Sequence, residues 1–451
     1  MALAGADRGT GLSDAVSGSG RRRGAPQTNR DGGARDSRPR IAVINCGSSS
    51  IRYQVFDADS GAPLARAVLD NIGAARAGLQ LRWRERVAAG SEPGERRELS
   101  QTAPIADHRE GFAWLLDAAR QVEELAPGPG LLGFGHRVVH GGERFRQPTR
   151  VDDEVLAAIV ALSPLAPLHN PVCALGIEVL RRLVPHLPHV AVFDTAFHQT
   201  LPQHAFRYAL PDALYREHAV RRYGFHGTSH CYVAGRAAAH LGMPANELRA
   251  VSLHLGAGAS AAAIDGGASV DTTMGMTPLE GLMMGTRCGD IDPALPFYLA
   301  RHTRMPLDEI EALLSHRSGL LGVGGSADMR EIERRAAAGD AAASLAFEMF
   351  CYRVKKTIGA YVAVLGGADA LIFTGGIGEN SPRVRSRVCQ RLGALGIVID
   401  EERNAEVNHD DGRARGAVTG IHRDDSIVRI LVIPTDEEAE IARQALATIR
   451  H

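Results

Sequence analysis

The chain has almost no lysine: among its 51 basic residues, only Lys355 and Lys356 are lysines. Arginine therefore supplies nearly every positive charge. An arginine that stands alone in this sequence says little about function, because the whole chain prefers arginine. Arginines become informative only where the residues around them form a motif.

Net charge is also nearly absent, at −1 over 451 residues. Such a chain has no overall field that would draw it to nucleic acid or to an anionic membrane. An anionic substrate must then be held by local cations. We therefore expect no nucleic acid and no membrane among its partners.

Long apolar runs and paired cysteines are missing as well. The stretch Ala360–Phe373 is interrupted by Gly366, Gly367 and Asp369, so no bilayer-spanning segment is expected. The cysteines lack paired or metal-ligand spacing, which predicts reduced thiols in a cytoplasmic protein. These residues are Cys46, Cys173, Cys231, Cys288, Cys351 and Cys389. With 45% hydrophobic residues, the chain is long enough for two domains with separate cores.

Two stretches about two hundred residues apart share one pattern. Ile41–Asp57 and Val251–Asp265 each contain an apolar strand, a turn rich in Gly, Ser or Ala, a second strand and an aspartate. Turns without bulky side chains let a ligand approach the backbone N–H groups and can hold phosphate. Two such turns suggest a duplicated scaffold that grips a polyphosphate from both sides of a cleft.

The remaining pattern is an alternation of strands and helices. Residues 1–38 are rich in Gly, Ala, Ser, Asp and Arg without hydrophobic period, which predicts a disordered extension. Strands are then expected from Arg40 to about Asp70. Alternation in two halves predicts an α/β protein with two similarly built domains. Further helices are expected near 109–124, 152–162, 172–183, 305–314 and 341–365, and strands near 131–134, 190–194, 250–265, 371–374 and 427–433, with a helix at the C-terminus.

Several collinear segments together resemble the acetokinase family, in the superfamily of acetate and sugar kinases, Hsp70 and actin. The resemblance runs from residue 40 to the end of the chain. The segments are Val43–Ser50, Gly135–Glu143, Ala166–Pro171, Phe193–Thr200, Tyr223–His230, Asp271–Pro293, Ser318–Gly322, Gly375–Ser381 and Ile433–Glu438.

The resemblance implies two duplicated ribonuclease H-like, actin-like ATPase domains around a central cleft. The N-terminal domain would span residues 39–197 and be completed by a C-terminal helix at 436–451. The C-terminal, nucleotide-binding domain would span residues 198–435. The family also implies reversible phosphoryl transfer from ATP to acetate in a cytoplasmic homodimer.

Phosphoryl transfer between two anions explains the residue types in these motifs. A carboxylate acceptor is already ionised at neutral pH and needs no general base, but it needs relief from charge repulsion. The resemblance assigns Arg137 to the substrate carboxylate, Arg287 to the transferring phosphoryl group and His226 to the transition state. Asp194 joins the catalytic group and is interpreted as an organiser of the metal and the arginines.

The other implied site residues divide into three groups. Mg²⁺ or Mn²⁺ would be linked to Asn45 and Glu437. The acetyl methyl group would lie against Val139, Leu168, Phe225 and Pro278. ATP would contact Arg52, His254, Leu255, Gly256, Ala257, Gly258, Asp328, Met329, Arg330, Gly376, Ile377, Gly378, Glu379 and Asn380, whereas His169, His198 and His230 are interpreted as structural.

Two residues depart from the family pattern. Arg52 stands where lysine is usual, which keeps the charge but changes its geometry. Ala257 stands where asparagine is usual, so the backbone donors of that turn remain while a side-chain amide is lost. These departures bear on catalytic efficiency and on the choice of phosphoryl donor.

Three alternatives remain open at this point. Propionate is a credible second substrate, because one methylene changes pocket binding by only about 1 to 3 kcal/mol. A non-catalytic nucleotide switch is disfavoured by Arg137, His226 and Arg287 together, since a switch has no use for a carboxylate-binding arginine. A pyrophosphate-dependent kinase is disfavoured by the nucleoside segments.

Overall fold

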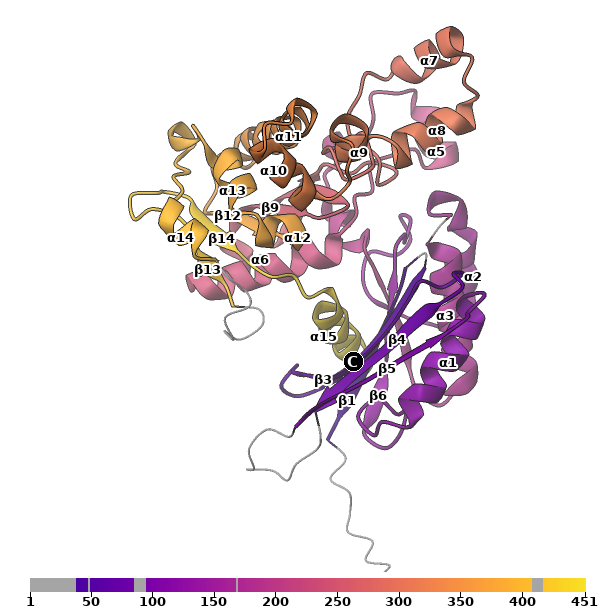
Figure 1. Cartoon of the computed structure of the whole chain (residues 1–451). Coiled ribbons are helices and arrows are strands. Elements are labelled where there is room, and N and C mark those ends of the chain that lie inside the picture. Colours follow the sequence, from indigo (N-terminus) through magenta and orange to yellow (C-terminus); the bar gives the residue numbers. More distant parts are fainter. Residues whose placement is uncertain (1–37, 48, 85–94, 168, 408–416) are drawn as a thin grey trace, which may run out of the picture. The chain divides into compact units, whose positions relative to one another are not determined.

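The computed structural model describes residues 38–47, 49–84, 95–167, 169–407 and 417–451 (Figure 1). The expectations for Ser48, for Leu168 and for the tail before Arg38 lie outside the described residues. Residues 38–451 form one compact unit.

The first part of this unit is built on an eight-stranded mixed sheet in the order β5-β4-β3-β2-β1-β6-β8-β7. In it β1 pairs antiparallel with β2 and parallel with β6, which is parallel to β8. The strands are β1 (Arg40–Cys46), β2 (Ser50–Asp57), β3 (Pro63–Asp70), β4 (Ala77–Arg84), β5 (Arg96–Ala103), β6 (Leu131–Val138), β7 (Thr149–Arg150) and β8 (His189–Phe193).

The expectation that strands end near Asp70 is wrong, because β4 and β5 extend the antiparallel meander to Ala103. β5 lies at the sheet edge and reads RRELSQTA, with most of its side chains exposed. Only Leu99 and Ala103 of β5 pack against the core, so the strand carries little alternating apolar signal. The expected strand 131–134 is likewise too short, since β6 continues to Val138 and includes Arg137.

The second sheet has six strands in the order β11-β10-β9-β12-β14-β13. Here β9 pairs antiparallel with β10 and parallel with β12, which is parallel to β14. The strands are β9 (Arg249–Leu255), β10 (Ala259–Asp265), β11 (Ala268–Thr272), β12 (Ala370–Thr374), β13 (Thr419–Gly420) and β14 (Arg429–Val432).

The two sheets therefore repeat one arrangement of strands. The run β3-β2-β1-β6-β8 and the run β11-β10-β9-β12-β14 each start with an antiparallel meander and continue with parallel strands. The glycine turns of the sequence pattern follow β1 and β9, the equivalent strands of the two runs. The predicted α/β fold with two duplicated halves is confirmed.

Helices pack on both sheets. In the first part and the connection they are α1 (His108–Arg120), α2 (Asp153–Ala161), η1 (Ser163–Leu165), α3 (Asn170–Leu183), η2 (Ala196–Thr200), α4 (Gln203–Phe206) and α5 (Asp212–His218). Those that follow are α6 (Gly227–Leu241), η3 (Ala245–Glu247), α7 (Leu295–Thr303), α8 (Leu307–His316), α9 (Gly319–Gly324), α10 (Met329–Ala337), α11 (Ala341–Leu365), α12 (Gly375–Asn380), α13 (Pro382–Cys389), η4 (Gly393–Leu395), α14 (Glu401–Ala405) and α15 (Glu437–Arg450).

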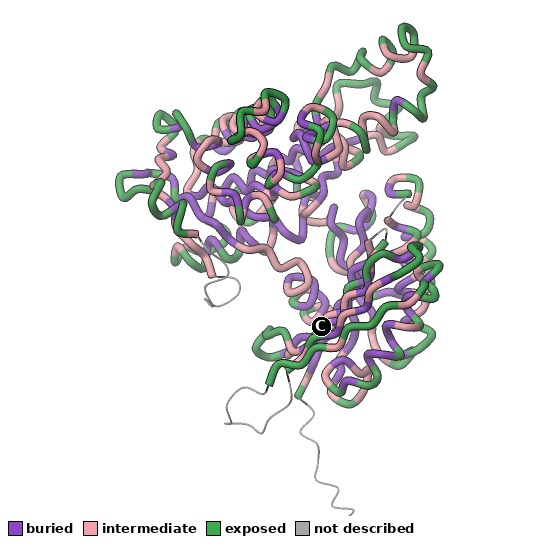
Figure 2. The backbone as a smooth tube through the Cα atoms, viewed as in Figure 1, coloured by how far each residue is buried: buried purple, intermediate pink, exposed green. Residues whose placement is uncertain are grey.

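The last helix, α15, packs on the first sheet although it follows β14 of the second. Its Ile441, Ala442 and Ala445 are buried with residues of β1 and β8 (Figure 2). A Cβ at Gly135 of β6 would lie 2.8 Å from Ile441 Cγ2, so only glycine allows this close packing. Burial of a large aliphatic side chain contributes roughly 1.5 to 3 kcal/mol, which holds α15 and its first acidic residues beside the sheet. No described helix is both long and apolar enough to cross a bilayer.

Candidate active site

Arg137 lies at the end of β6 and is held by a carboxylate and an amide. Its Nε and Nη2 donate to Asp194 at 3.1 and 2.6 Å, and its Nη1 donates to Asn45 Oδ1 at 3.1 Å. Burial alone would lower the pKa of Arg137, but the Asp194 and Glu437 carboxylates outweigh it and raise that pKa. The guanidinium is thus a permanent, oriented charge.

A guanidinium presents a side fork of Nε and Nη2 and an end fork of Nη1 and Nη2. Asp194 occupies the side fork of Arg137. After these bonds, one N–H of Nη1 and one N–H of Nη2 have no hydrogen-bond partner among the described residues. Arg137 can therefore bind a second anion while Asp194 keeps its side chain in place.

The acidic residues that begin α15 meet the same cluster. Glu437 Oε2 lies 3.8 Å from Arg137 Nε, and Asn45 Nδ2 donates to Glu438 Oε1 at 3.0 Å. Arg52 Nη1 lies 3.8 Å from Glu438 Oε1. Burial raises the pKa of Glu437, against the opposing effect of Arg137. A partly buried carboxylate with two acidic neighbours, Asp194 and Glu438, is suited to a further cation.

The donor set fits a hard divalent cation that keeps most of its water. Mg²⁺ takes oxygen ligands and binds through one or two carboxylates together with substrate phosphates. Glu437 and the amide oxygen of Asn45 are ligands of this type. Among the described residues, no three Asp, Glu, His or Cys side chains are grouped so that they could hold a metal ion.

His226 adopts a backbone conformation that is rare for a residue with a side chain. Its φ of 57° lies in the left-handed region, directly before α6. Gly227 N donates to Asp194 O at 3.0 Å, and a Cβ at Gly227 would lie 2.2 Å from that oxygen. Thr228 Oγ1 also donates to Asp194 Oδ1 at 3.2 Å. Asp194 thereby fixes both Arg137 and the turn that presents His226, and strain of this kind is common at active sites.

The imidazole of His226 is neutral and stacked. Burial lowers the pKa of His226 well below its ordinary value, and His254 and His230 lower it further. Its ring stacks on that of His254 with centroids 4.2 Å apart. His254 Nδ1 is 2.8 Å from Ser229 Oγ, which is 2.8 Å from Thr435 Oγ1. A neutral His226 can donate a hydrogen bond to an anion without a net charge of its own.

Arg287 reaches the same place from the long loop that follows β11. Its Nη1 donates to Pro278 O at 2.9 Å and lies 3.4 Å from Met284 Sδ, and burial lowers its pKa. The described residues give its guanidinium no carboxylate partner. A Cβ built on Gly258 would lie 3.4 Å from His226 Nε2 and 3.5 Å from Arg287 Nη1. Both donors therefore converge on the glycine turn that follows β9.

The turn after β9 and the segment after β12 lie next to each other. Thr374 pairs with His254 in the parallel ladder, and a Cβ at Gly256 would lie 3.9 Å from Gly376 N. The Gly375–Asn380 segment forms a short helix, α12. Ala257 is exposed, and its carbonyl accepts from Gly285 N at 3.1 Å. The turn thus keeps its backbone bonds without the asparagine.

Several expected nucleotide contacts are engaged within the protein. Glu379 Oε1 accepts from Gly375 N at 2.9 Å and from Thr435 N at 3.1 Å, which ties α12 to the segment before α15. Asp328 begins α10 and forms an exposed ion pair with Arg330. Their contact with ATP stays a prediction.

Of the four apolar pocket residues, Val139 and Phe225 are buried and Pro278 is partly buried. Val139 directly follows β6, and Phe225 directly precedes His226. Pro278 is joined to Arg287 through its carbonyl. Leu168 lies outside the described residues, so the pocket assignment as a whole stays a prediction.

Sequence reasoning missed several polar residues of this site. Glu438 could have been noticed as the second acid of the Thr435-Asp-Glu-Glu motif. Thr228 and Ser229 stand inside a quoted motif but gave no separate signal. His169, interpreted as structural, interacts electrostatically with the site. Burial lowers its pKa most, and the charges of Arg137 and Arg287 lower it further.

Buried histidines give the stability of the protein a defined pH dependence. Burial lowers the pKa of His140, His189, His198 and His254 to about 4, against 6.5 in the unfolded chain. Between these values the unfolded chain binds more protons, so the free energy of unfolding rises with pH. The contribution of these neutral rings to the free energy of unfolding is complete above about pH 6.5 and is lost as the pH falls towards about 4. We expect the urea midpoint to fall steadily between about pH 7 and 5.

The variant His189→Gln should reduce the slope of the urea midpoint against pH, because it removes one of these four titrating rings. His189 lies in β8, away from the catalytic residues. A urea midpoint that is constant over the same pH range would contradict the buried, neutral state of these rings.

Comparison with known proteins connects this geometry to a family. A model of the acetokinase family matches residues 40–443. An acetate kinase of Syntrophobacter fumaroxidans is 56% identical over 412 residues, which cover 91% of this chain and 97% of that protein. A propionate kinase of Citrobacter rodentium is 48% identical over 414 residues, covering 90% of this chain and 96% of that protein. The crystal structure of Porphyromonas gingivalis acetate kinase is 40% identical, with a TM-score of 0.81 over 92% of this chain and 100% of that chain.

Proposed function

Because the chain belongs to the acetokinase family, we propose that it is an ATP:acetate phosphotransferase that forms acetyl phosphate and ADP reversibly. The observation that carries the proposal is the convergence of Arg287 and His226 at the Gly258 turn, with Arg137 presenting a second fork nearby. This arrangement provides one site for a carboxylate and another for a transferring phosphoryl group.

In this mechanism the end fork of Arg137 binds the acetate carboxylate and aims one oxygen at the γ-phosphorus of ATP. The acceptor is ionised at neutral pH, so no residue has to remove a proton. Arg287 and the Nε2 side of His226 stabilise the charge on the equatorial oxygens during in-line transfer. Asp194 acts by holding Arg137 and the His226 turn, which agrees with its interpretation as an organiser.

The remaining site residues would hold the nucleotide and its metal. Glu437 and Asn45 would hold Mg²⁺ or Mn²⁺, which would neutralise charge on the nucleotide phosphates when bound. The backbone of the Gly256–Gly258 turn and of α12 would face the phosphates of ATP. Arg52 adds a half-exposed cation beside Glu438.

A hydroxamate-trapping assay tests this function. The purified chain is incubated with acetate, propionate or butyrate against ATP, GTP or pyrophosphate, and the acyl hydroxamate is measured. We expect acetate with ATP to give the highest kcat/KM. Preference for propionate would assign the second candidate function, which the similarity to propionate kinases favours. Absence of any acyl hydroxamate in an ATP-binding protein would identify a non-catalytic nucleotide switch.

Val139 provides a prediction about the choice of acyl group. If its side chain lies against the methyl group of acetate, Val139→Ala enlarges that space and improves propionate relative to acetate. The change should lie within the roughly 10- to 200-fold range that one methylene commands. Ratios of kcat/KM for the two acids measure it. An unchanged ratio would place Val139 in the core and not in the acyl pocket.

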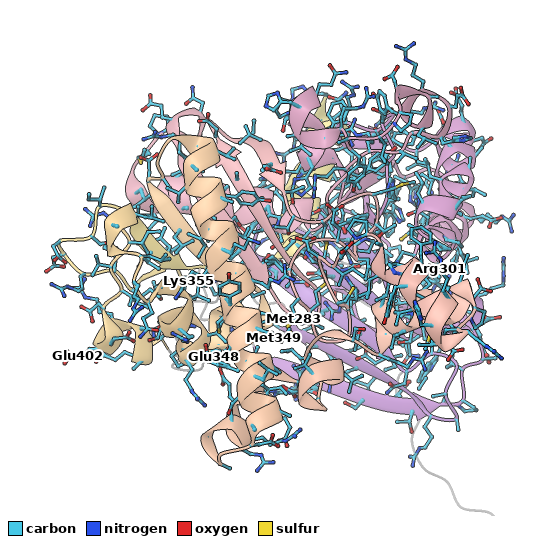
Figure 3. All side chains as sticks on the ribbon, turned by 90° about the horizontal axis from the view of Figure 1, so that it is seen from above. Met283, Arg301, Glu348, Met349, Lys355 and Glu402 are labelled. Carbon is cyan, nitrogen blue, oxygen red and sulfur yellow. The ribbon has the colours of Figure 1, made fainter. Side chains whose placement is uncertain are left out.

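We further propose a cytoplasmic homodimer divided into the domains 39–197 with 436–451, and 198–435. α11 exposes Leu345, Met349 and Tyr352, which are spaced to lie on one face of the helix. Figure 3 shows Met349 between Glu348 and Lys355 along α11. A second copy would cover this apolar face. Sedimentation equilibrium should therefore give twice the chain mass, and a monomer at micromolar concentration would contradict the dimer.

A further inference from the structure

Behind His226 lies a row of buried hydrogen bonds that the proposed mechanism does not use. His226 Nδ1 is 2.9 Å from Ser260 Oγ, and Ser260 Oγ is 2.8 Å from His230 Nε2. His230 Nδ1 is in turn 2.9 Å from Ser252 Oγ. Ser252, His230 and Ser260 each have 0% exposure. The row therefore runs from the strand core to the imidazole at the active site without contact with water.

The fold produces this row from neighbouring elements. His226 directly precedes α6 and His230 lies in its first turn, and the side chains of both reach Ser260 Oγ. In the β9–β10 ladder, Ser260 is paired with His254 and Ser252 with Ala262. Alternation places Ser252, His254 and Ser260 on the same face of the sheet, towards α6.

Counting hydrogens along the row decides its direction. Burial lowers the pKa of His226 and of His230 well below the ordinary value, so each ring carries a single N–H. Each serine hydroxyl also has one hydrogen to donate. Among the described residues, Ser252 Oγ has no hydrogen-bond partner other than His230 Nδ1. In two arrangements of the hydrogens Ser260 both donates and accepts; in a third, both rings donate to Ser260, and its own hydroxyl hydrogen is left without an acceptor among the described residues.

In the first arrangement, Ser252 donates to His230 Nδ1, His230 Nε2 donates to Ser260, and Ser260 donates to His226 Nδ1. Every hydrogen from Ser252 to His226 Nδ1 then has an acceptor, and the remaining hydrogen, on His226 Nε2, belongs to a ring that is only partly buried. In the reverse arrangement, His226 donates to Ser260, and the hydroxyl hydrogen of Ser252 is left without an acceptor. Leaving a buried donor without an acceptor is unfavourable, so the first arrangement is the most stable one.

We propose that Ser252, His230 and Ser260 are positioning residues that hold the ring of His226 in the tautomer with its hydrogen on Nε2. That nitrogen faces Arg287 across the Gly258 turn. In this tautomer it donates a hydrogen bond to a phosphoryl oxygen, whereas the opposite tautomer would present a lone pair and repel it. The consequence for catalysis rests on the proposed phosphotransfer, but the tautomer itself does not.

The tautomer can be observed directly in the intact protein. NMR of the chain labelled with ¹⁵N-histidine distinguishes protonated from unprotonated ring nitrogens, and His226→Gln and His230→Gln identify the two sets of signals. We expect His226 and His230 both to carry hydrogen on Nε2 near neutral pH. Hydrogen on Nδ1 of His226 would overturn the proposal, whatever the activity of the protein.

Two serine variants test whether the row transmits this preference. Ser260→Ala removes the donor to His226 and should lower kcat about tenfold, the effect of one hydrogen bond, with KM for both substrates changed less than about twofold. Ser252 bonds His230 and not His226. Ser252→Ala should nevertheless shift the ¹⁵N signals of His226. Unchanged signals in Ser252→Ala would show that Ser252 has no positioning role.

Ser269→Ala is the matched control. Ser269 is equally buried, and its Oγ lies 2.7 Å from His198 Nδ1, in a serine–histidine pair outside the row. Its loss should reduce stability without moving the ¹⁵N signals of His226. An equal shift in this control would mean that any buried serine loss disturbs the site, which overturns the proposal. If Ser252→Ala does not fold, Ser252→Cys and Ser252→Thr, which retain a donor, should leave the tautomer as in the natural chain.

A chain with the expected tautomer but no acyl hydroxamate would remove the proposed function and leave the positioning row intact. An active chain with hydrogen on Nδ1 of His226 would support the proposed function and overturn the positioning role of the row. The two failures are therefore distinguishable.

Discussion

Replacing Arg287 by alanine is expected to lower kcat by roughly 10² to 10³, the cost of one preorganised donor at a developing charge. Arg287 and His226 Nε2 flank the Gly258 turn, and the described residues give Arg287 only neutral partners. No described residue neutralises its charge, so we expect that charge to act on the phosphoryl group. Steady-state kinetics of acetyl hydroxamate formation measure the effect.

Stability should respond to Arg287→Ala differently from activity. Burial lowers the pKa of this guanidinium, because removing its charge from water is unfavourable. The alanine variant has no such desolvation penalty. We expect a urea midpoint equal to or above that of the natural chain. Arg287→Lys keeps the charge but not the planar fork and should recover only part of kcat. Near-normal turnover of Arg287→Ala would remove this residue from the mechanism.

Asp194→Asn should damage both stability and catalysis. Asp194 is 1% exposed and accepts from Arg137 and Thr228, while its backbone oxygen accepts from Gly227. Removing one partner of a buried ion pair costs about 3 to 5 kcal/mol, because the other charge stays buried. In the same variant Arg137 loses its side-fork partner, so kcat/KM for acetate should fall by more than about tenfold. Urea unfolding and acetate kinetics measure the two losses.

Glu348→Gln provides a control with similar hydrogen bonds at the surface. Arg387 Nε and Nη2 bond Glu348 at 2.9 and 2.5 Å, but the two side chains are 40% and 49% exposed. Exposed pairs contribute about 0 to 1 kcal/mol, so this variant should be nearly as stable as the natural chain. Equal destabilisation by both substitutions would mean that burial does not determine the role of Asp194.

The sequence pattern located some strands and helices and missed others. β9 and β12 are apolar and lead into glycine segments, and α11 is long and periodic, so pattern located all three. β5 was missed because only Leu99 and Ala103 mark its inner face. α12 was not predicted as a helix, and in the structure the Glu379 carboxylate accepts from Gly375 N at the start of this glycine-rich helix.

The site shows the same division. The resemblance of the motifs to the acetokinase family selected Arg137, His226 and Arg287, and the structure brings His226 and Arg287 to the same glycine turn, at Gly258. Spacing carries no information about partners that come from distant segments. Glu438 reaches Asn45 across 393 residues, and Ser260 reaches His226 across 34.

The sequence by itself determined the α/β alternation, the duplicated glycine turns and the charged residues offered to an anionic reaction, because period, turn chemistry and residue type are local properties. Only the tertiary structure decided which fork of Arg137 is occupied and which way the hydrogens run behind His226. Those depend on distances between residues brought together by the packing of α6 and α15 on two different sheets. Packing of that kind is a property of the whole fold, since each contact exists only after strands far apart in the chain have paired.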